Sequence, residues 1–118
     1  MTTTLLSAVP VLASLDLERS LAFYEQKLGF ERRAVFPTYA VLARDGVEVH
    51  LWKCDDRHIA ENTSCRLNVR GIDDLYADCL SKLIVHPNAP LTDQPWGLRE
   101  FGIVDLDGNL IKFAEKRA

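Results

Sequence analysis

Apolar residues along the chain follow two patterns, strand-like stretches and stretches at helical spacing, and the order of these patterns occurs twice. The stretch Leu5–Ser14 is mostly apolar and predicts a strand, in which Pro10 lacks an N–H and therefore marks a sheet edge or a bend. Apolar residues then recur at helical spacing between Asp16, a suitable N-cap, and Gly29, a suitable C′ residue. Strands are predicted next at Glu31–Phe36, Thr38–Arg44 and Val47–Lys53.

The second half of the chain repeats this order. Residues 55–64 are polar and predict a helix-poor linker. Cys65–Val69 predicts a strand, and a second helix is expected with Asp73 or Asp74 as its N-cap. The apolar face expected for this helix comprises Ile72, Leu75, Tyr76, Cys79, Leu80 and Leu83. The last two strands are predicted at Arg99–Val104 and Leu110–Glu115.

Turn signals mark the hairpins of both copies, as Asp45-Gly46 in the first and Asp107-Gly108-Asn109 in the second. The sequence therefore predicts an α+β fold, a single domain over residues 1–118 in which two βαβββ modules form curved mixed sheets. Module 1 covers about 5–53 and module 2 about 65–116. Helices would cover one face of each sheet and leave the opposite face to a ligand.

Charge and cysteine content narrow the function classes. The 118 residues include 14 basic and 17 acidic groups, and neither half is basic, so we expect no nucleic-acid partner. The longest apolar run, Leu5–Leu15, is too short to span a bilayer and follows no basic segment, which favours a cytoplasmic protein with no membrane partner. The cysteines are odd in number and lack C-x-x-C spacing, so neither a disulfide framework nor a zinc knuckle is predicted.

Candidate metal ligands are few. His50 lies two residues from Glu48 on a predicted strand, so the two share a face and would supply two ligands at most. The later strands hold no second cluster, and Lys112 puts a cation at the centre of the last one. No nucleophile elbow or glycine-rich phosphate loop is present. We expect no metal or other cofactor.

Aromatic residues form the stronger candidate site. Trp52, Phe36 and Tyr39 lie on or near predicted strands, whereas Trp96 lies in a turn-like stretch where helix packing is not expected. These side chains either pack in the ordinary way or form a stacking wall for a flat ligand. In the second case the acceptors for a cationic ligand would be Glu48, Glu100 and Asp105.

Motifs spread over nearly the whole chain closely resemble bleomycin resistance proteins, which belong to the vicinal-oxygen-chelate (glyoxalase/bleomycin resistance/dioxygenase) superfamily. The motifs are Leu6-Ser7-Ala8-Val9-Pro10-Val11-Leu12, Phe23-Tyr24 with Leu28-Gly29-Phe30, Val69-Arg70-Gly71-Ile72-Asp73-Asp74-Leu75-Tyr76-Ala77, Gln94-Pro95-Trp96-Gly97, Arg99-Glu100-Phe101 and Asp105-Leu106-Asp107-Gly108-Asn109.

The resemblance implies paired βαβββ modules and a domain-swapped homodimer, in which the N-terminal strand crosses to the partner with Pro10 as the hinge. It also implies two ligand clefts at the dimer interface. A bleomycin-type antibiotic would be sequestered there without being modified, so the resemblance favours a binding protein over an enzyme.

The metal positions of the superfamily fall near Val9, Glu48, Cys65 and Lys112, of which only Glu48 is a good ligand. The ligand-binding positions match in part. Trp96 and Gly97 fit the stacking corner and Tyr39 fits an aromatic position, but Arg33 stands where an acid is expected, Ala34 replaces an aromatic residue and Arg66 replaces a tryptophan. The expected ligand-binding set is Trp96, Gly97, Tyr39, Trp52, Arg66 and Glu48.

Two alternatives stay open on the sequence. Arg33 and Arg66 favour negative charge, so the same scaffold would bind another small aromatic ligand, including an anionic one. Alternatively, Glu48 and His50 with a residue from the partner would serve a metal-dependent glyoxalase-like or dioxygenase-like enzyme.

Overall fold

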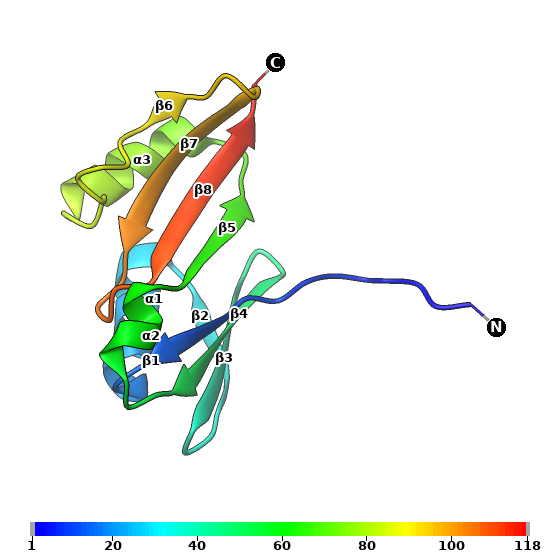
Figure 1. The fold of residues 1–118 in the computed structure, drawn as a ribbon, viewed down its shortest axis with the longest axis vertical. Helices are drawn as coiled ribbons and strands as arrows, with labels where there is room; N and C mark the ends of the chain where they lie inside the picture. Colours follow the sequence, from blue (N-terminus) through cyan, green and yellow to red (C-terminus); the bar gives the residue numbers. More distant parts are fainter. Residues whose placement is uncertain (1, 118) are drawn as a thin grey trace.

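The computed structural model describes residues 2–117 and shows an α+β fold with two four-stranded sheets (Figure 1). The first, sheet A, has the order β1-β4-β3-β2, and the second, sheet B, has the order β5-β8-β7-β6. β1 pairs with β4 in parallel, as β5 does with β8, and all the other neighbouring strands are antiparallel. The two halves therefore share one topology, and the predicted fold of two βαβββ modules is confirmed.

Sheet A lies in the lower half of Figure 1, and all of its strands except the first agree closely with the predicted ones. Its strands are β1 Val11–Ser14, β2 Glu31–Val35, β3 Tyr39–Arg44 and β4 Val47–Lys53. The β3–β4 hairpin turns at Asp45 and Gly46, which have φ angles of 52° and 80° as a two-residue turn of this kind requires. Register shifts between Arg32 and Ala34, so Arg33 is the extra residue of a bulge in β2.

Sheet B lies in the upper half of Figure 1. Its strands are β5 Ser64–Asn68, β6 Thr92–Asp93, β7 Leu98–Val104 and β8 Leu110–Lys116. Helix α1, Leu17–Leu28, packs on sheet A, and α3, Ile72–Ser81, packs on sheet B. Each helix covers one face of its sheet, and apolar side chains from both modules form one continuous core.

The first helix follows its sequence signals. The Asp16 side chain accepts a hydrogen bond from the Arg19 N–H, and Gly29 ends the helix in the left-handed region at φ 72°. Leu21, Tyr24 and Leu28 are buried on the side that faces sheet A.

The predicted N-terminal strand is longer than the observed one. Only Val11–Ser14 pairs with β4, and residues 2–10 form no strand within the chain. Figure 1 shows this segment leading away from both sheets, and Leu5 and Leu6 are 93% and 92% exposed. Pro10 stands where the segment leaves the sheet, and its carbonyl still accepts a hydrogen bond from the His50 N–H.

Two local predictions for helices are wrong. The expected helix-poor segment contains α2, Arg57–Glu61, because Asp56 caps it and Ala60 is buried in a cluster with Ala13 and Cys54. The N-cap of α3 is Gly71 rather than Asp73 or Asp74.

The start of α3 is stabilised from a distant strand. The Glu115 carboxylate on β8 accepts hydrogen bonds from the N–H groups of Gly71 and Ile72, and so replaces a local cap. The far end of the expected apolar face is also exposed: Leu80, in the last turn of α3, is 47% exposed, and Leu83, beyond the helix end at Ser81, is 92% exposed.

A buried polar network joins the two modules. The Asp105 carboxylate, from the β7–β8 turn of sheet B, accepts a hydrogen bond of 2.6 Å from the Tyr24 hydroxyl of α1. The Asn109 amide donates to the same carboxylate and to the Ala13 carbonyl of β1. Burial raises the pKa of Asp105, although these donors lower it, and burial also raises the pKa of Tyr24.

Candidate functional site

The strand pairing decides which side chains lie opposite the core. Side chains alternate across a strand, and on β4 Val49 and Leu51 are buried beneath α1. Glu48, His50 and Trp52 therefore lie on the other surface, which we call the open face of sheet A. By the same alternation, sheet B has an open face opposite α3.

The open face of sheet A carries a hydrogen-bonded chain of three side chains. The Tyr39 hydroxyl lies 2.6 Å from His50 Nδ1, and His50 Nε2 lies 2.7 Å from Glu48 Oε1. Because a carboxylate only accepts, Nε2 carries the proton, and Nδ1 of a neutral imidazole accepts from the hydroxyl. The rings of Tyr39 and His50 meet edge to face with centroids 5.4 Å apart, and Trp52 is the neighbour of Tyr39 across the hairpin.

This arrangement uses both imidazole nitrogens in hydrogen bonds, which leaves His50 poorly placed as a metal ligand. Among residues 2–117, no three His, Cys, Asp or Glu side chains cluster as a metal site would require. Glu48 and His50 share one face as expected, and they are joined there by a hydrogen bond at which the Glu48 side chain is half-exposed.

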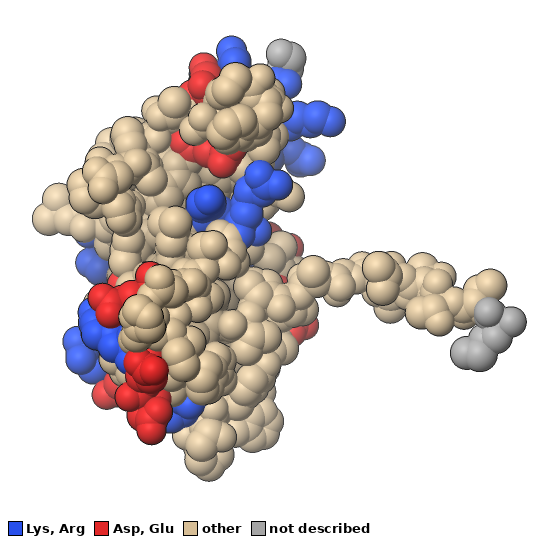
Figure 2. Space-filling view, viewed as in Figure 1, with Lys and Arg blue, Asp and Glu red and all other residues tan. Residues whose placement is uncertain are grey.

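The open face of sheet B carries a hollow of about 410 Å³, within the range of small-ligand pockets. Its lining residues are Ser64, Cys65, Arg66, Trp96, Glu100 and Lys112. The Trp96 side chain is 63% exposed, and its indole N–H donates a hydrogen bond to Glu100. Figure 2 shows basic side chains gathered over β8 and β5 on the viewed surface.

The predicted site residues divide between the two open faces. Trp96 and Arg66 line the hollow of sheet B together. Gly97 follows Trp96 in a turn and has φ 88°, a conformation that favours glycine, but it does not line the hollow. Tyr39, Trp52 and Glu48 lie on sheet A, so one chain does not bring the whole set into one cleft.

Two chemical features of the sheet B hollow go beyond the predicted set. Lys112 is a cross-strand neighbour of Arg66 and lines the same hollow, although the sequence suggested it only as an obstacle to metal binding. The spacing of the residues gives no sign of this pairing, because the register of β5 on β8 joins segments far apart in the chain. Burial raises the pKa of the Cys65 thiol to about 11, so this cysteine stays protonated and is a poor nucleophile at neutral pH.

Arg33 does not join this site. It lies in the bulge of β2, and its guanidinium is 2.8 Å from the carboxylate of Glu31. The suggestion that Arg33 and Arg66 together favour an anion therefore keeps only Arg66.

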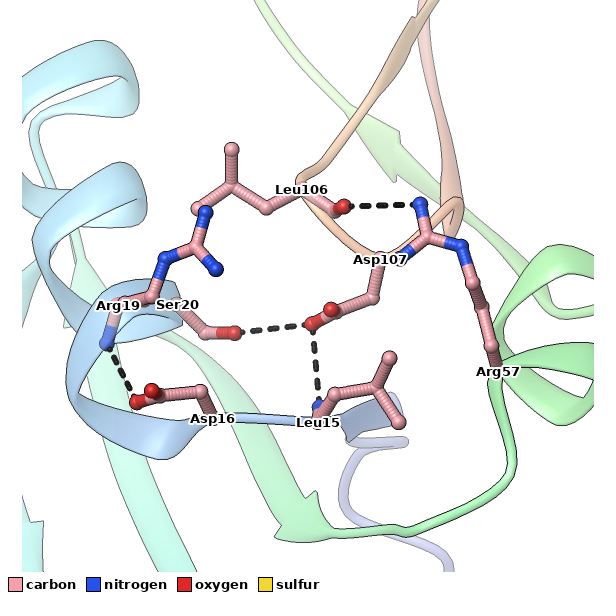
Figure 3. Close-up of a pocket in the computed structure, with 7 residues that line it drawn as sticks. All are labelled: Leu15, Asp16, Arg19, Ser20, Arg57, Leu106 and Asp107. Atoms are coloured by element: carbon pink, nitrogen blue, oxygen red, sulfur yellow. Dashed lines mark hydrogen bonds between the residues drawn. The ribbon is translucent and has the colours of Figure 1, made fainter.

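A second hollow, of about 290 Å³, lies where the modules meet (Figure 3). Its polar groups largely bond one another: Asp107 accepts from Ser20 and from the Leu15 N–H, and Arg57 donates to the Leu106 carbonyl. These bonds join the start of α1 and the segment before it to the β7–β8 turn, and Asp16 and Arg19, which bond each other, complete the lining. We interpret this hollow as a structural junction.

Comparison with known families agrees with this architecture. Residues 8–113 match the model of the Glyoxalase/Bleomycin resistance protein/Dioxygenase superfamily. The chain belongs to this superfamily. Its paired βαβββ modules are those that the sequence resemblance implies, and the resemblance is confirmed.

Named relatives narrow the position within the superfamily. The chain is 36% identical to a bleomycin resistance protein of Geobacillus stearothermophilus and to one of Staphylococcus aureus, with 95% of this chain and 98% of each relative covered. A bleomycin-binding protein from Streptomyces verticillus, solved in complex with copper(II)-bleomycin, superposes with a TM-score of 0.84 at 26% identity over 99% of both chains. A bleomycin resistance determinant encoded on transposon Tn5 superposes with a TM-score of 0.83 at 26% identity, over 95% of this chain and 98% of the other.

No helix within residues 2–117 is both long enough and apolar enough to cross a membrane.

Proposed function

We propose that this protein binds a bleomycin-type antibiotic and sequesters it without chemical change. The relatives named above support this proposal by their own names and by the bound drug in one of them. The observation that carries it is Trp96, a large aromatic side chain 63% exposed at the rim of a 410 Å³ hollow. An exposed indole held by a hydrogen bond to Glu100 is suited to stack on a flat ligand.

The chemistry of the candidate residues favours binding over catalysis. The Cys65 thiol is protonated at neutral pH because burial raises its pKa to about 11. The His50 imidazole is engaged at both nitrogens by Tyr39 and Glu48. Neither group is set up as a free nucleophile or base, and the proposal requires no metal and no other cofactor.

We further propose that the binding unit is a homodimer. Leu5 and Leu6 are 93% and 92% exposed on a segment that leads away from its own chain, a state that contact with a second copy would relieve (Figure 1). A partner that presents its sheet A to this sheet B would place Tyr39 and Trp52 of the partner subunit across a cleft from Trp96. Pro10, at the point where the segment leaves β1, is the proposed hinge.

Calorimetric titration with metal-free bleomycin tests the binding proposal. We expect saturable binding at one drug per chain, and about tenfold or greater weakening in Trp96→Ala, because stacking and apolar contact are lost. Arg33→Gln is the matched control, since Arg33 is exposed and paired outside the hollow. Equal affinity in wild type and Trp96→Ala would remove Trp96 from the site.

The dimer proposal has its own test. Deletion of residues 1–9 removes Leu5, Leu6 and Val9 and should yield monomers or aggregates in sedimentation, while the intact protein sediments as a dimer. A stable dimer after this deletion would contradict strand exchange.

A further inference from the structure

Arg66 and Lys112 place two positive charges side by side on the open face of sheet B. They are direct neighbours in the parallel register of β5 on β8, and both are exposed and line the same hollow. Like charges on neighbouring strand positions repel each other and destabilise a sheet. This pair is therefore a local cost that the fold itself does not require.

Two other arginines of sheet B and its end, one on β7 and one just after β8, lie close to carboxylates. Arg99 pairs with Asp93 and Asp73, and Arg117 lies 3.6 Å from Asp93. Within residues 2–117, in contrast, neither Arg66 nor Lys112 takes part in an ion pair.

The hollow contains one carboxylate, which does not cancel the two positive charges. Glu100 lines the same hollow, but its side chain accepts the indole N–H of Trp96 and forms no ion pair with either cation. The hollow thus keeps a net positive charge beside an exposed aromatic ring.

We infer that Arg66 and Lys112 form an oxyanion subsite, which binds the carboxylate or phosphate of a ligand whose aromatic part lies against Trp96. Guanidinium presents a planar fork that binds two oxygens at once, and ammonium adds three rotatable donors. The volume of about 410 Å³ accommodates an aromatic ring with one such group. The inference goes beyond drug sequestration and uses one chain only, so it stands or falls apart from the antibiotic and from the dimer.

Matched ligands separate the charge from the ring. We would titrate the protein with 1-naphthoate, 1-naphthyl phosphate and neutral 1-naphthamide, and follow the indole N–H resonances of Trp96 and Trp52 by NMR. The two anions should move the Trp96 signal in a saturable way and bind at least about tenfold more tightly than the amide, since charge-assisted hydrogen bonds are lost with the amide. Whichever anion binds more tightly identifies the preferred group. Equal binding of all three compounds, or none, would overturn the inference.

Matched variants assign the effect to the cation pair. Lys112→Met keeps most of the length of the side chain and removes its charge, and it should weaken naphthoate binding by about tenfold. Lys53→Met makes the same charge change at an exposed position at the end of β4, outside the hollow, and should leave the affinity unchanged. Arg66→Gln provides an independent second variant with the same expected loss.

Folding is verified for each variant by its dispersed NMR spectrum. Wild-type affinity in folded Lys112→Met and Arg66→Gln would overturn the subsite. A protein that binds bleomycin but not naphthoate would refute this subsite alone, and the reverse result would refute the proposed function alone.

Discussion

Sheet A and sheet B repeat one strand order, yet their open faces treat polar side chains in opposite ways. On sheet A, Tyr39, His50 and Glu48 satisfy one another through hydrogen bonds of 2.6 and 2.7 Å. On sheet B, Arg66 and Lys112 lie side by side without an ion pair among the described residues. The first face is internally balanced, whereas the second has charge left over for a ligand.

The contrast shows that the two modules must share their core positions but not the side chains of their open faces. Apolar positions recur at the same places in both halves, as Leu12 on β1 beside Leu51 on β4, and Leu67 on β5 beside Phe113 on β8. The core needs these positions filled with apolar side chains in each copy. The open faces have no such requirement, so they are free to differ and to specialise in ligand recognition.

The largest expected effect comes from disrupting the buried polar network at Asp105, which joins the module of sheet A to that of sheet B. Asp105→Asn should lower the free energy of unfolding by about 3 kcal/mol, because the NH₂ of the new amide would face an N–H or O–H group that now donates to a carboxylate oxygen. The donors are the Tyr24 hydroxyl, the Asn109 amide and the N–H groups of Asp107 and Asn109. Urea denaturation measures the change, and a loss below about 1 kcal/mol would show that the network is not the link.

The same substitution has a pH signature. Burial raises the pKa of Asp105, so the folded chain takes up this proton at a higher pH than the unfolded chain does. The resulting stabilisation is complete below the unfolded pKa and is lost as the pH rises through the folded pKa. The Asp105→Asn variant has no carboxylate at this position to take up the proton. The free energy of unfolding of the wild type should therefore exceed that of the variant by a larger amount as the pH is lowered. A constant difference would contradict the raised pKa.

A smaller loss is expected when the balanced face of sheet A is disturbed. Tyr39→Phe removes the hydroxyl that donates to His50 and should cost about 1 kcal/mol in the free energy of unfolding. Thermal denaturation measures the change, and an unchanged free energy of unfolding would show that this hydrogen bond does not stabilise the face.

On sheet B, a substitution on the open face should stabilise the protein instead of destabilising it. Lys112→Met removes the repulsion with Arg66 and should raise the free energy of unfolding of the ligand-free protein by about 0.5 kcal/mol at low salt. The gain should shrink at high salt, since both side chains are exposed and screened. A loss of stability at low salt would mean that Lys112 has a favourable partner and that the charges are not in conflict.

The smallest effect is expected at Arg33. Arg33→Gln removes an ion pair with Glu31 in which both side chains are more than half exposed, so unfolding and drug affinity should both stay unchanged within error. A clear loss of drug affinity in calorimetry would return Arg33 to the binding site.

The sequence predicts most elements because their signals are local. Helix α1 has its own cap at Asp16, its own stop at Gly29 and an apolar face between them, and the β3–β4 hairpin has Asp45-Gly46. The elements that were missed depend on distant groups. The short helix α2 rests on packing of Ala60 against β1, and α3 begins at Gly71 because Glu115 of β8 accepts its first N–H groups.

The candidate site was predictable in its residue types but not in its grouping. Alternation along β4 places Glu48 and His50 on one face, as the sequence predicts. The joining of Arg66 with Lys112 requires the register between strands that lie far apart in the chain. Likewise, the separation of Trp96 from Tyr39 follows from the division into two sheets, which motif matching does not reveal.

One measurement tests the central claim most directly: titration of the 15N-labelled protein with metal-free bleomycin, with both tryptophan indole N–H signals followed by NMR. If the antibiotic lies in a cleft between the two kinds of face, Trp96 and Trp52 should shift together and saturate at one drug per chain, with micromolar or tighter affinity. No shift of either signal up to about millimolar drug, where binding is worth only about 4 kcal/mol, would contradict the account.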